Sequence, residues 1–511
     1  MTQPSWSAAL TGSVHHELRE HLLRADGQED VCLATYRLST GVRRRSGLVR
    51  ETIMPRDGDR LVHGTASFTT PYVLRAAERA AADQCGVVAL HSHPGSRGWQ
   101  GMSCADRSTE ASYANLVREI TGLPLIGMTL AGDDYWSARA WDQGVGRHVA
   151  ATECENARVV HDDRLVVSWN DTVRPAPTPQ PTQVRTAHCW GDAVQADIAR
   201  LRILVVGAGS VGLTVAIALA ATGIEHIAVM DHDTITNINL DRLLGAKPLD
   251  AFLARSKSQL CYRLVADAAT ANNPQHDAWE HSVCEPAGFL NLLDFDVVFS
   301  CVDRPWPRYV LNTAAYSDLV PVIDGGIHVD PFPHGGMRGA MWRSHVVGPG
   351  RACLACNGQY HPSHVALERD GSLDDPTYIS GLPFDHPLRV RQNVSVLSVN
   401  CAGALLAQFI SLVVTPGGLG DPGALRYQLG PHLLQRDATT TCIPGCPYPA
   451  NTGTGDLRLD PTGRHLAAER ERAARTRAQR RPDVRIVRAG DDLLLSLRAR
   501  LNRRARQCSA V

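Results

Sequence analysis

Two histidines and an aspartate near the start of the chain are spaced to suit a metal ion. His91 and His93 follow the apolar run 87–90, and Ser103 and Asp106 come soon after, at the start of an expected helix. Side chains at positions i and i+2 leave a strand on the same side, so both imidazoles can reach one ion. The aspartate adds a third ligand and leaves a position for water, as in catalytic zinc sites. The pattern predicts hydrolysis, because zinc lowers the pKa of bound water to about 7 and a nearby carboxylate can move its proton.

A glycine-rich turn in the middle of the chain predicts a nucleotide-binding fold. Gly207, Gly209 and Gly212 lie between the apolar run 202–206 and an expected helix. The glycines allow a tight turn and close approach of the backbone to a phosphate, and the helix start offers unpaired N–H groups. Asp231 ends the next expected strand, 19 residues after Gly212, where it is placed for a ribose hydroxyl. This pattern alone suits NAD, FAD or ATP equally.

Charged and amide side chains after this turn point to nucleotidyl transfer. They are Asp231, Asp233, Asn239, Arg242, Lys257, Asp303 and Arg308. Arginine and lysine neutralise a triphosphate, and an aspartate can hold the Mg²⁺ that bridges it. A dehydrogenase has no need for such groups at its pyrophosphate, so the sequence disfavours an NAD oxidoreductase. Lysine occurs only at 247 and 257, which adds weight to Lys257.

Four cysteines form two closely spaced pairs. Cys353 and Cys356 make a CxxC pair, and Cys442 and Cys446 make a CxxxC pair after 85 intervening residues. Such soft sulfur ligands suit a closed, structural zinc site. The 14 cysteines of the chain are too dilute for a disulfide scaffold. We expect a structural Zn²⁺ that joins the last strands to the nucleotide-binding region, with unliganded thiols as the alternative.

The expected elements divide the chain into four parts. Residues 1–150 mix strands with helices, and residues 151–184 form a proline-rich linker. Residues 185–450 alternate apolar strands with helices, as parallel α/β proteins do. Residues 451–511 are an arginine-rich helical tail with 15 arginines and 7 acids. The tail is interpreted as a solvated helical face, and contact with an acidic partner or nucleic acid is the alternative. The expected strands are 31–36, 86–90, 125–130, 202–206, 227–230, 295–300 and 320–324, and the expected helices are 71–83, 106–120, 211–222, 394–413, 469–481 and 493–501.

The composition is that of a soluble globular chain. Its 511 residues are 44% hydrophobic and 20% charged, with 52 basic and 52 acidic side chains. A net charge of zero does not favour nucleic-acid binding by the chain as a whole. The sequence shows neither a run of about 18 apolar residues nor a signal-peptide core, so we expect a cytoplasmic protein with no membrane partner.

The histidine and aspartate pattern resembles that of the JAMM/MPN (JAB) metalloprotease family. The family motif is an upstream glutamate, then His-x-His-Pro and Ser-x-x-Asp, and the resemblance covers residues 1–150. It implies that His91, His93 and Asp106 hold a catalytic zinc, and that Ser103 helps to bind the tetrahedral oxyanion.

The upstream glutamate of this resemblance falls on Glu29. It lies at the head of the expected strand 31–36 and would act as the general base. Asp30 and Glu51 are the alternative bases.

The central region resembles the ThiF/MoeB-type family of ubiquitin-activating adenylyltransferases over residues 185–450. The resemblance implies that Lys257 contacts phosphates and that Asp303 carries Mg²⁺. Arg185 falls where the family places an arginine supplied by the partner subunit, which implies a homodimer. The same family carries a four-cysteine zinc site. Its Asp-x-Asp…Asn-x-x-Arg spacing is matched by Asp231, Asp233, Asn239 and Arg242.

The chain departs from activating enzymes that form a thioester. Those enzymes use a cysteine in the segment after the first CxxC, and residues 357–400 contain none. Cys401 lies in an expected apolar helix, where a structural role is the simpler interpretation. The chain therefore stops at the acyl-adenylate, or uses another cysteine such as Cys189 or Cys508, or relies on a partner's cysteine.

The expected fold class is α/β. A JAB/MPN-type domain precedes a Rossmann-like ThiF-type adenylation domain with a four-cysteine zinc site and an arginine-rich helical tail. The expected function is bifunctional. ATP and Mg²⁺ would serve to adenylate the C-terminal carboxylate of a ubiquitin-like protein, and a catalytic Zn²⁺ would serve to cleave that modifier from a precursor or target. A conjugating enzyme is a further expected partner.

Two other functions remain open on the sequence. One is a sulfur-carrier adenylyltransferase of cofactor biosynthesis, whose sulfur comes from a separate protein. The other is an adenylyltransferase or scaffold with an inactive JAB-like recognition domain.

Overall fold

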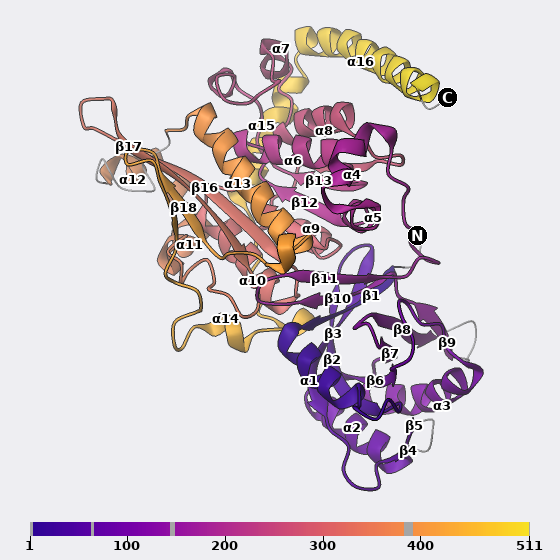
Figure 1. Ribbon diagram of the computed structural model, residues 1–511. Helices are drawn as coiled ribbons and strands as arrows, with labels where there is room; N and C mark the ends of the chain where they lie inside the picture. The colour runs from indigo at the N-terminus through magenta and orange to yellow at the C-terminus, as the bar shows by residue number, and fades with distance from the viewer. Residues whose placement is uncertain (1–3, 63–65, 144–148, 383–391, 510–511) are drawn as a thin grey trace.

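The computed structural model describes the chain except for residues 1–3, 63–65, 144–148, 383–391 and 510–511. The described residues form two large sheets, one in each of two adjoining units, and a small two-stranded sheet of residues 60–62 and 66–68 (Figure 1). The N-terminal unit holds a nine-stranded sheet of order β11-β10-β1-β3-β2-β6-β7-β8-β9. The central unit holds an eight-stranded sheet of order β14-β13-β12-β15-β16-β17-β18-β19. Its first five strands pair in parallel, and β17, β18 and β19 are antiparallel.

The N-terminal sheet is flanked by three helices. The elements of this unit are β1 (Ser5–Thr11), α1 (Gly12–Leu22), β2 (Val31–Thr40), β3 (Arg44–Ile53), β4 (Arg60–Val62), β5 (Ala66–Phe68), α2 (Thr70–Ala82), β6 (Gly86–His93), α3 (Cys104–Thr121), β7 (Leu125–Ala131), β8 (Trp136–Gln143), β9 (Val149–Glu153), β10 (Asn156–Val160) and β11 (Leu165–Trp169). The strand β6 is central and almost wholly buried, so its last residues are held firmly where the sheet ends.

The sheet continues past residue 150, where the sequence suggested a linker from 151 to 184. β10 lies inside that range, is buried along its whole length and pairs in parallel with β1. The linker interpretation was wrong there because the prolines are confined to residues 174–182, while 156–160 is a fully buried strand. The extended connection between the two units is therefore short.

The central sheet is covered by helices on both faces, which follows from the apolar strands at its middle. Ile203 and Val205 of β12 join one core with α6, α8 and α13, whereas Leu204 and Val206 join another with α9 and α10. Such double burial is typical of parallel sheets. The elements are α4 (Val184–Trp190), α5 (Asp192–Ala199), β12 (Arg202–Val206), α6 (Ser210–Thr222), β13 (His226–Met230), α7 (Pro248–Phe252), α8 (Lys257–Ala268), β14 (Gln275–Trp279), α9 (Pro286–Leu292), β15 (Val297–Ser300), α10 (Pro305–Ser317), β16 (Val322–Pro331), β17 (Met337–Val347), α11 (Pro362–Arg369), α12 (Pro376–Gly381), α13 (Ser395–Val413), β18 (Leu425–Gln428), β19 (Leu433–Arg436) and α14 (Pro447–Ala450).

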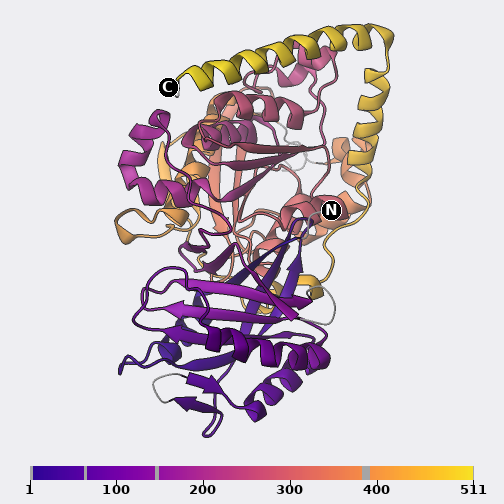
Figure 2. The ribbon, with the colours of Figure 1, turned by 90° about the vertical axis from the view of Figure 1, so that its right-hand side faces the viewer.

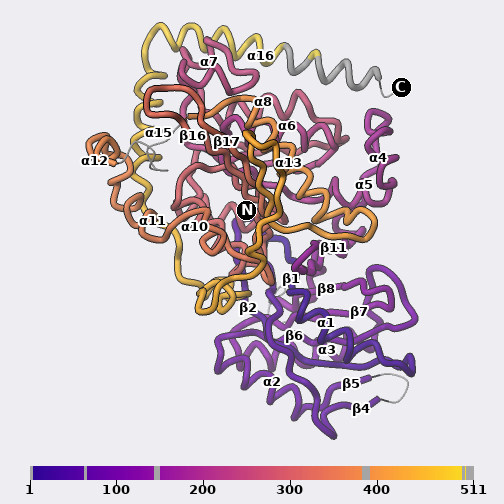
Figure 3. The backbone as a smooth tube through the Cα atoms, turned by 60° about the vertical axis from the view of Figure 1, so that its left-hand side comes forward, coloured from indigo at the N-terminus to yellow at the C-terminus, as the bar shows by residue number. Residues whose placement is uncertain are grey.

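The helix α13 is the one described helix whose length and composition would also allow it to cross a membrane. In this fold it is a core helix, because Cys401, Leu405 and Phe409 are buried against the central sheet. Figure 3 shows it lying beside α6 and the strands β16 and β17. Burial in the protein core accounts for its apolar composition.

The two units are joined through a buried ion-pair network. Arg44 of β3 and Arg158 of β10 both donate to Asp296, which precedes β15, and all three side chains are fully buried. Burial opposes the charged carboxylate, but the surrounding arginines outweigh it and lower the pKa of Asp296. Removing one partner of such a buried pair typically costs about 3–5 kcal/mol. The N-terminal unit is thus fixed to the central unit.

The arginine-rich tail forms two helices, α15 (Leu466–Gln479) and α16 (Pro482–Ser509). Figure 2 shows α15 running along one side of the central unit and α16 crossing its end. The second helix is much longer than the expected 493–501, because it begins with Pro482 at its first turn and no further proline follows within it.

Candidate functional site

The glycine-rich turn has the geometry that a phosphate-binding loop requires. Gly207 has a φ of 93°, and a Cβ there would lie 2.5 Å from the carbonyl oxygen of Cys301. A Cβ on Gly212 would lie 1.8 Å from the carbonyl oxygen of Gly207. Gly209 is the N-cap residue of α6, so the helix start faces the turn. Side chains are excluded at 207 and 212, and the free N–H groups of the first helical turn remain available to an anion.

The acidic residues after β13 lie beside this turn, and one of them is paired with a lysine. Asp231 is buried and accepts from the backbone N–H of Ala208 at 2.6 Å and of Asp233 at 2.7 Å. Lys257, the first residue of α8, donates from Nζ to Asp233 Oδ2 at 2.7 Å. Burial disfavours the ammonium, but the carboxylates of Asp231 and Asp233 outweigh it and raise the pKa of Lys257. The structure brings together the glycine turn, both aspartates and the lysine.

The other sequence-predicted residues of this site lie around its edge. Asp303 is exposed after β15, and its charge also acts on Lys257. Asn239 ends a short 3₁₀ turn and accepts from the backbone of Thr236. Arg242 is not bonded to the cluster, since it donates to a backbone oxygen of that turn and to the neighbouring Asp241.

Two further predicted residues stand apart from the cluster. Arg185 is exposed on α4. Arg308 is buried and donates to Asp324 of β16 at 3.3 Å and to the backbone oxygen of Val302, which follows β15. It therefore links β16 to the end of β15.

The four predicted cysteines converge. Their sulfur atoms all lie within 4.8 Å of one another, and the Sγ atoms of Cys353 and Cys446 are 3.8 Å apart. Four thiolates at a Zn–S distance of about 2.3 Å around a tetrahedral ion lie about 3.8 Å from each other. The donor set and its geometry therefore fit a structural zinc. Cys353 and Cys356 follow β17 and Cys442 and Cys446 precede α14, so an ion here would join two distant segments.

The histidine and aspartate residues of the N-terminal unit also converge. The ligand atoms of His91, His93 and Asp106 lie within 4.8 Å of one another, and His91 Nε2 is 3.9 Å from Asp106 Oδ2. Burial lowers the pKa of His91 to about 3, with a further contribution from Arg139, so its imidazole is neutral at pH 7. Two imidazoles and one carboxylate are suitable zinc ligands.

The structure separates the three acidic residues proposed as the base. Glu29 Oε1 lies 3.9 Å from His93 Nε2, and partial burial raises the pKa of Glu29. Asp30 is buried and paired with Arg60 and Arg24. Glu51 is exposed beside Arg79. Only Glu29 among these three faces the histidines.

Ser103 has a structural bond that the sequence did not predict. Its Oγ accepts from the N–H of Asp106 at 3.1 Å, and its own N–H donates to Asp106 Oδ2 at 3.1 Å, which makes a capping box at the start of α3. A hydroxyl that accepts one bond still has its proton to donate. The box also fixes the direction of the Asp106 carboxylate.

Residues that the sequence reasoning missed hold the two imidazoles. Gln100 places Oε1 3.4 Å from His93 Nδ1, while its NH₂ group donates to two loop carbonyl oxygens and so fixes the amide orientation. Thr129 of β7 lies 3.3 Å from His91 Nε2, and it accepts from Arg139 at 3.0 Å. Arg139 pairs in turn with Glu110, which is on the same helix as Asp106. A partner on the ring nitrogen that faces away from the metal orients a metal-binding histidine, which is the position of Gln100 on His93.

The cysteines considered for a thioester differ in access. Cys401 is buried in α13, in line with a structural role, whereas Cys189 is exposed on α4 with Sγ 3.2 Å from the Arg185 carbonyl oxygen. The side chain of Cys508 lies outside the described residues.

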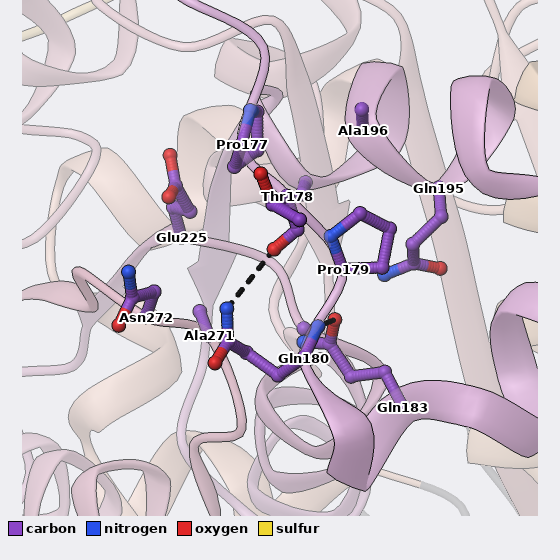
Figure 4. Close-up of a pocket in the computed structure, with 12 residues that line it drawn as sticks. Pro177, Thr178, Pro179, Gln180, Gln183, Gln195, Ala196, Glu225, Ala271 and Asn272 are labelled. Carbon is purple, nitrogen blue, oxygen red and sulfur yellow. Dashed lines mark hydrogen bonds between the residues drawn. The ribbon is translucent and has the colours of Figure 1, made fainter. Parts of the chain in front are cut away.

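A small cavity lies beside α5, and none of the candidate site residues described above lines it. It has a volume of about 10 Å³ and is lined by the linker residues 177–180 together with Gln183 and Gln195 (Figure 4). Gln180 donates to the backbone oxygen of Thr178 across it at 3.0 Å. Such a space holds about one water molecule and no substrate.

Comparison with known proteins identifies the central unit. Residues 182–413 match the model described as the ThiF family. The chain contains a ThiF domain. The match begins at α4 and ends with α13, so it includes the glycine turn, both aspartates and the lysine described above.

Curated relatives of this domain are adenylyltransferases. MOCS3 of Caenorhabditis briggsae, an adenylyltransferase and sulfurtransferase, is 25% identical over 225 residues, which are 42% of this chain and 51% of that protein. UBA4 of Yarrowia lipolytica, with the same description, is 31% identical over 137 residues, 26% of this chain and 33% of that protein. MoeZ of Mycobacterium tuberculosis, a probable adenylyltransferase/sulfurtransferase, is 30% identical over 129 residues, 25% of this chain and 31% of that protein. The chain spans about half the length of the first and a third of the other two.

Among solved structures, E. coli MccB in complex with ATP is similar in part. It has a TM-score of 0.39 at 16% identity, over 53% of this chain and 74% of that chain. A further structure of E. coli MccB has a TM-score of 0.40 at 15% identity, over 56% of this chain and 75% of that chain.

Proposed function

We propose that the ThiF domain of this chain uses ATP to adenylate the C-terminal carboxylate of a ubiquitin-like or sulfur-carrier protein. The observation that carries this proposal is the cluster of Asp231, Asp233 and Lys257 beside the glycine turn. A carboxylate for ribose and a cation for phosphates lie together there. The descriptions of MOCS3, UBA4 and MoeZ as adenylyltransferases support it.

The reaction balances without a redox partner. A carboxylate oxygen of the carrier attacks the α-phosphorus of ATP, a new P–O bond forms, and the bond to the β-phosphate bridging oxygen breaks. The products are an acyl-adenylate and pyrophosphate. Lys257 offsets the charge that develops on the phosphates. Mg²⁺ supplies further positive charge to the triphosphate, and Asp303 is the residue that would hold it.

The fate of the adenylate favours the sulfur-carrier alternative over conjugation. Residues 357–400 contain no cysteine to take the acyl group as a thioester. The three relatives are described as sulfurtransferases as well as adenylyltransferases. We therefore propose that sulfide from a separate donor attacks the acyl carbon of the adenylate, so that a C–S bond forms, the bond to AMP breaks, and the products are a thiocarboxylate and AMP. Transfer to a conjugating enzyme is the competing outcome.

The test is ATP–pyrophosphate exchange with a panel of purified ubiquitin-like and sulfur-carrier proteins. Exchange should require one carrier of the panel, and the same carrier lacking its last residue should give none. After exchange, mass spectrometry with a sulfide donor should show a thiocarboxylate on the carrier. Lack of exchange with every carrier, in the presence of MgATP, contradicts the proposal.

We propose a second activity for the N-terminal unit, namely zinc-dependent cleavage of the peptide or isopeptide bond that follows the modifier's C-terminus. The convergence of His91, His93 and Asp106 with Glu29 at 3.9 Å supports it. In this proposal Glu29 takes a proton from the attacking water and gives it to the leaving amine, and Ser103 donates to the oxyanion. Zinc would supply the activated water.

The test of this second activity uses the modifier fused to a short C-terminal peptide. Wild-type protein should release the peptide, and Glu29→Gln should bind zinc normally yet release it at least about 100-fold more slowly, since general acid–base catalysis contributes that much. Glu51→Gln is the matched control and should behave as wild type. Equal rates for Glu29→Gln and wild type would exclude Glu29 as the base.

A further inference from the structure

The C-terminal tail returns to the nucleotide site of the ThiF domain. The tail lies outside the matched range 182–413, yet α15 packs beside the loop 231–236 that follows β13. Figure 2 shows the tail along one side of the central unit. We call residues 461–492 the strap.

Two side chains of α15 bind that loop directly. Arg475 is nearly buried and donates from Nη1 to the carbonyl oxygen of His232 at 2.8 Å and to Thr234 Oγ1 at 3.2 Å. Its Nη2 donates to Glu280 at 2.7 Å, so the guanidinium is fixed at both ends. Glu471 Oε1 accepts from the backbone N–H of Thr234 at 3.1 Å. A backbone donor and a backbone acceptor of one short loop are therefore both satisfied by the strap.

The start of the strap also packs against the same loop. The ring of His465 lies 5.1 Å from that of His232 and 5.2 Å from that of Trp306. Trp306 Nε1 donates to the carbonyl oxygen of Pro461 at 2.9 Å. His465 is also anchored by a 2.8 Å hydrogen bond between its Nδ1 and Ser282 Oγ. These contacts hold His232, which lies between the two site aspartates.

The end of the strap reaches the residues that precede Lys257. Gln479 donates to the carbonyl oxygen of Ala254 at 2.8 Å. Arg255 pairs with Asp491 of α16 and with Asp250. The strap thus contacts both segments of the site, the one with the aspartates and the one with the lysine.

We infer that the strap is a positioning element of the nucleotide site, with Arg475 and Glu471 as its positioning residues. They fix the backbone of 231–236, so that Asp231 and Asp233 face the ribose and phosphates before ATP arrives. Without these bonds the loop must lose conformational freedom when ATP binds, which weakens binding. The inference rests on the proposed adenylation function and adds to it a segment that the ThiF match does not include.

The test compares three variants of the full chain for MgATP affinity by titration calorimetry. Arg475→Ala should raise the Kd for MgATP about tenfold and Glu471→Ala about threefold, as expected when bonds that pre-arrange a site are lost. Arg472→Ala is the matched control, because Arg472 lies on the same helix and donates to Glu285 and to the backbone oxygen of Glu280, whereas the bonds described for it do not reach the loop 231–236. Its Kd should stay within about twofold of wild type, since rim ion pairs contribute little.

A rescue variant separates positioning from general destabilisation. Glu471→Gln keeps the oxygen that accepts from Thr234, so it should restore the wild-type Kd. Thermal denaturation of all variants identifies any that do not fold, and Glu471, being only half-buried, provides a variant that keeps the fold.

The outcomes distinguish the two proposals. If Arg475→Ala and Glu471→Ala bind MgATP with the same Kd as Arg472→Ala, the role of the strap is overturned. The proposed adenylation activity is not affected by that outcome. Equal losses in Glu471→Ala and Glu471→Gln would also overturn it. A wild-type chain that binds no MgATP would overturn the proposed function and this inference together.

Discussion

Two clusters among the described residues contain histidine and carboxylate groups at metal-binding distances, and they differ in whether a lysine is paired with them. Asp231, His232 and Asp233 have ligand atoms within 4.8 Å of one another, but Lys257 already donates to Asp233 at 2.7 Å. The negative charge of this cluster is balanced inside the protein. It therefore suits the hydroxyls and phosphates of a nucleotide better than a metal ion of its own.

The cluster of the N-terminal unit is balanced differently. The groups that act on the Asp106 carboxylate are Ser103 and the two imidazoles of His91 and His93, and those that act on Glu29 are His93 and Asp106. Neither lysine nor arginine is among these groups, so a divalent ion would supply positive charge to the two carboxylates. The charge of the neighbours, more than the number of ligand atoms, is the difference between the proposed nucleotide site and the proposed metal site.

The largest expected effect is at the lysine of the nucleotide cluster. Lys257→Ala removes the cation that offsets phosphate charge, so exchange of pyrophosphate should fall by at least about 100-fold, as for other groups that stabilise transition-state charge. Lys247→Ala is the matched control, because Lys247 is the other lysine of the chain and is exposed at the start of α7. Exchange kinetics with the cognate carrier measure both. Equal activity of the two variants would show that the Asp231–Asp233 cluster does not serve ATP.

The next effect concerns zinc and tests the other half of the comparison. Elemental analysis should find two zinc ions per wild-type chain and one after His91→Ala/His93→Ala, because that variant removes two of three ligands. Lys257→Ala should still hold two.

The controls for the zinc count assign each ion. Cys442→Ser/Cys446→Ser should also leave one zinc, and it should lower thermal stability more than the histidine variant, since the cysteine site joins two distant segments. A single zinc in wild type that the histidine substitutions do not change would mean that the His91 cluster binds none, and the N-terminal unit would then be a recognition domain.

A third prediction asks whether the nucleotide site is completed by a second chain. If Arg185 enters the partner's site in a homodimer, Arg185→Ala and Lys257→Ala should each be inactive alone. An equal mixture that exchanges subunits should recover about a quarter of wild-type exchange, because half of the dimers are mixed and each has one intact site. Exchange assays on the co-expressed mixture measure this. If the mixture is as inactive as its components, Arg185 acts in the site of its own chain or has no role in the site.

The sequence predicted the local parts of these sites better than their distant support. Strand ends and helix starts follow from short apolar runs, so the positions of Gly207, Asp231 and His91 relative to β12, β13 and β6 could be predicted. Arg475 is 243 residues from the oxygen of His232 that it binds, and no local pattern pairs them. The same holds for the buried pair of Arg44 and Asp296 that joins the two units.

The errors have a similar origin. The linker was extended over β10 because the prolines after it dominated the composition of that stretch, whereas its partner β1 lies about 150 residues earlier. The boundary of α16 was set by the apolar residues of 493–501, although the helix begins eleven residues earlier at Pro482. In both cases long-range pairing or helix continuity decided what a short window could not.

The smallest expected effect lies beside the metal-type cluster, at a residue that the motif does not contain. In the native chain the Gln100 oxygen holds the proton of His93 on Nδ1, so that Nε2 is directed toward Glu29. Gln100→Ala removes this acceptor. Such outer partners typically change metal affinity about tenfold or more, so zinc should bind about tenfold more weakly, with the zinc count still two at saturating metal.

Chelator competition measures that affinity. Gln180→Ala serves as the control, because Gln180 is also a loop glutamine that donates to a backbone carbonyl oxygen, yet it lies in the linker far along the chain from the histidines. An unchanged affinity in Gln100→Ala would mean that the His93 ring is held by its strand alone. The charge balance of the cluster, rather than the orientation of its ligands, would then determine zinc binding.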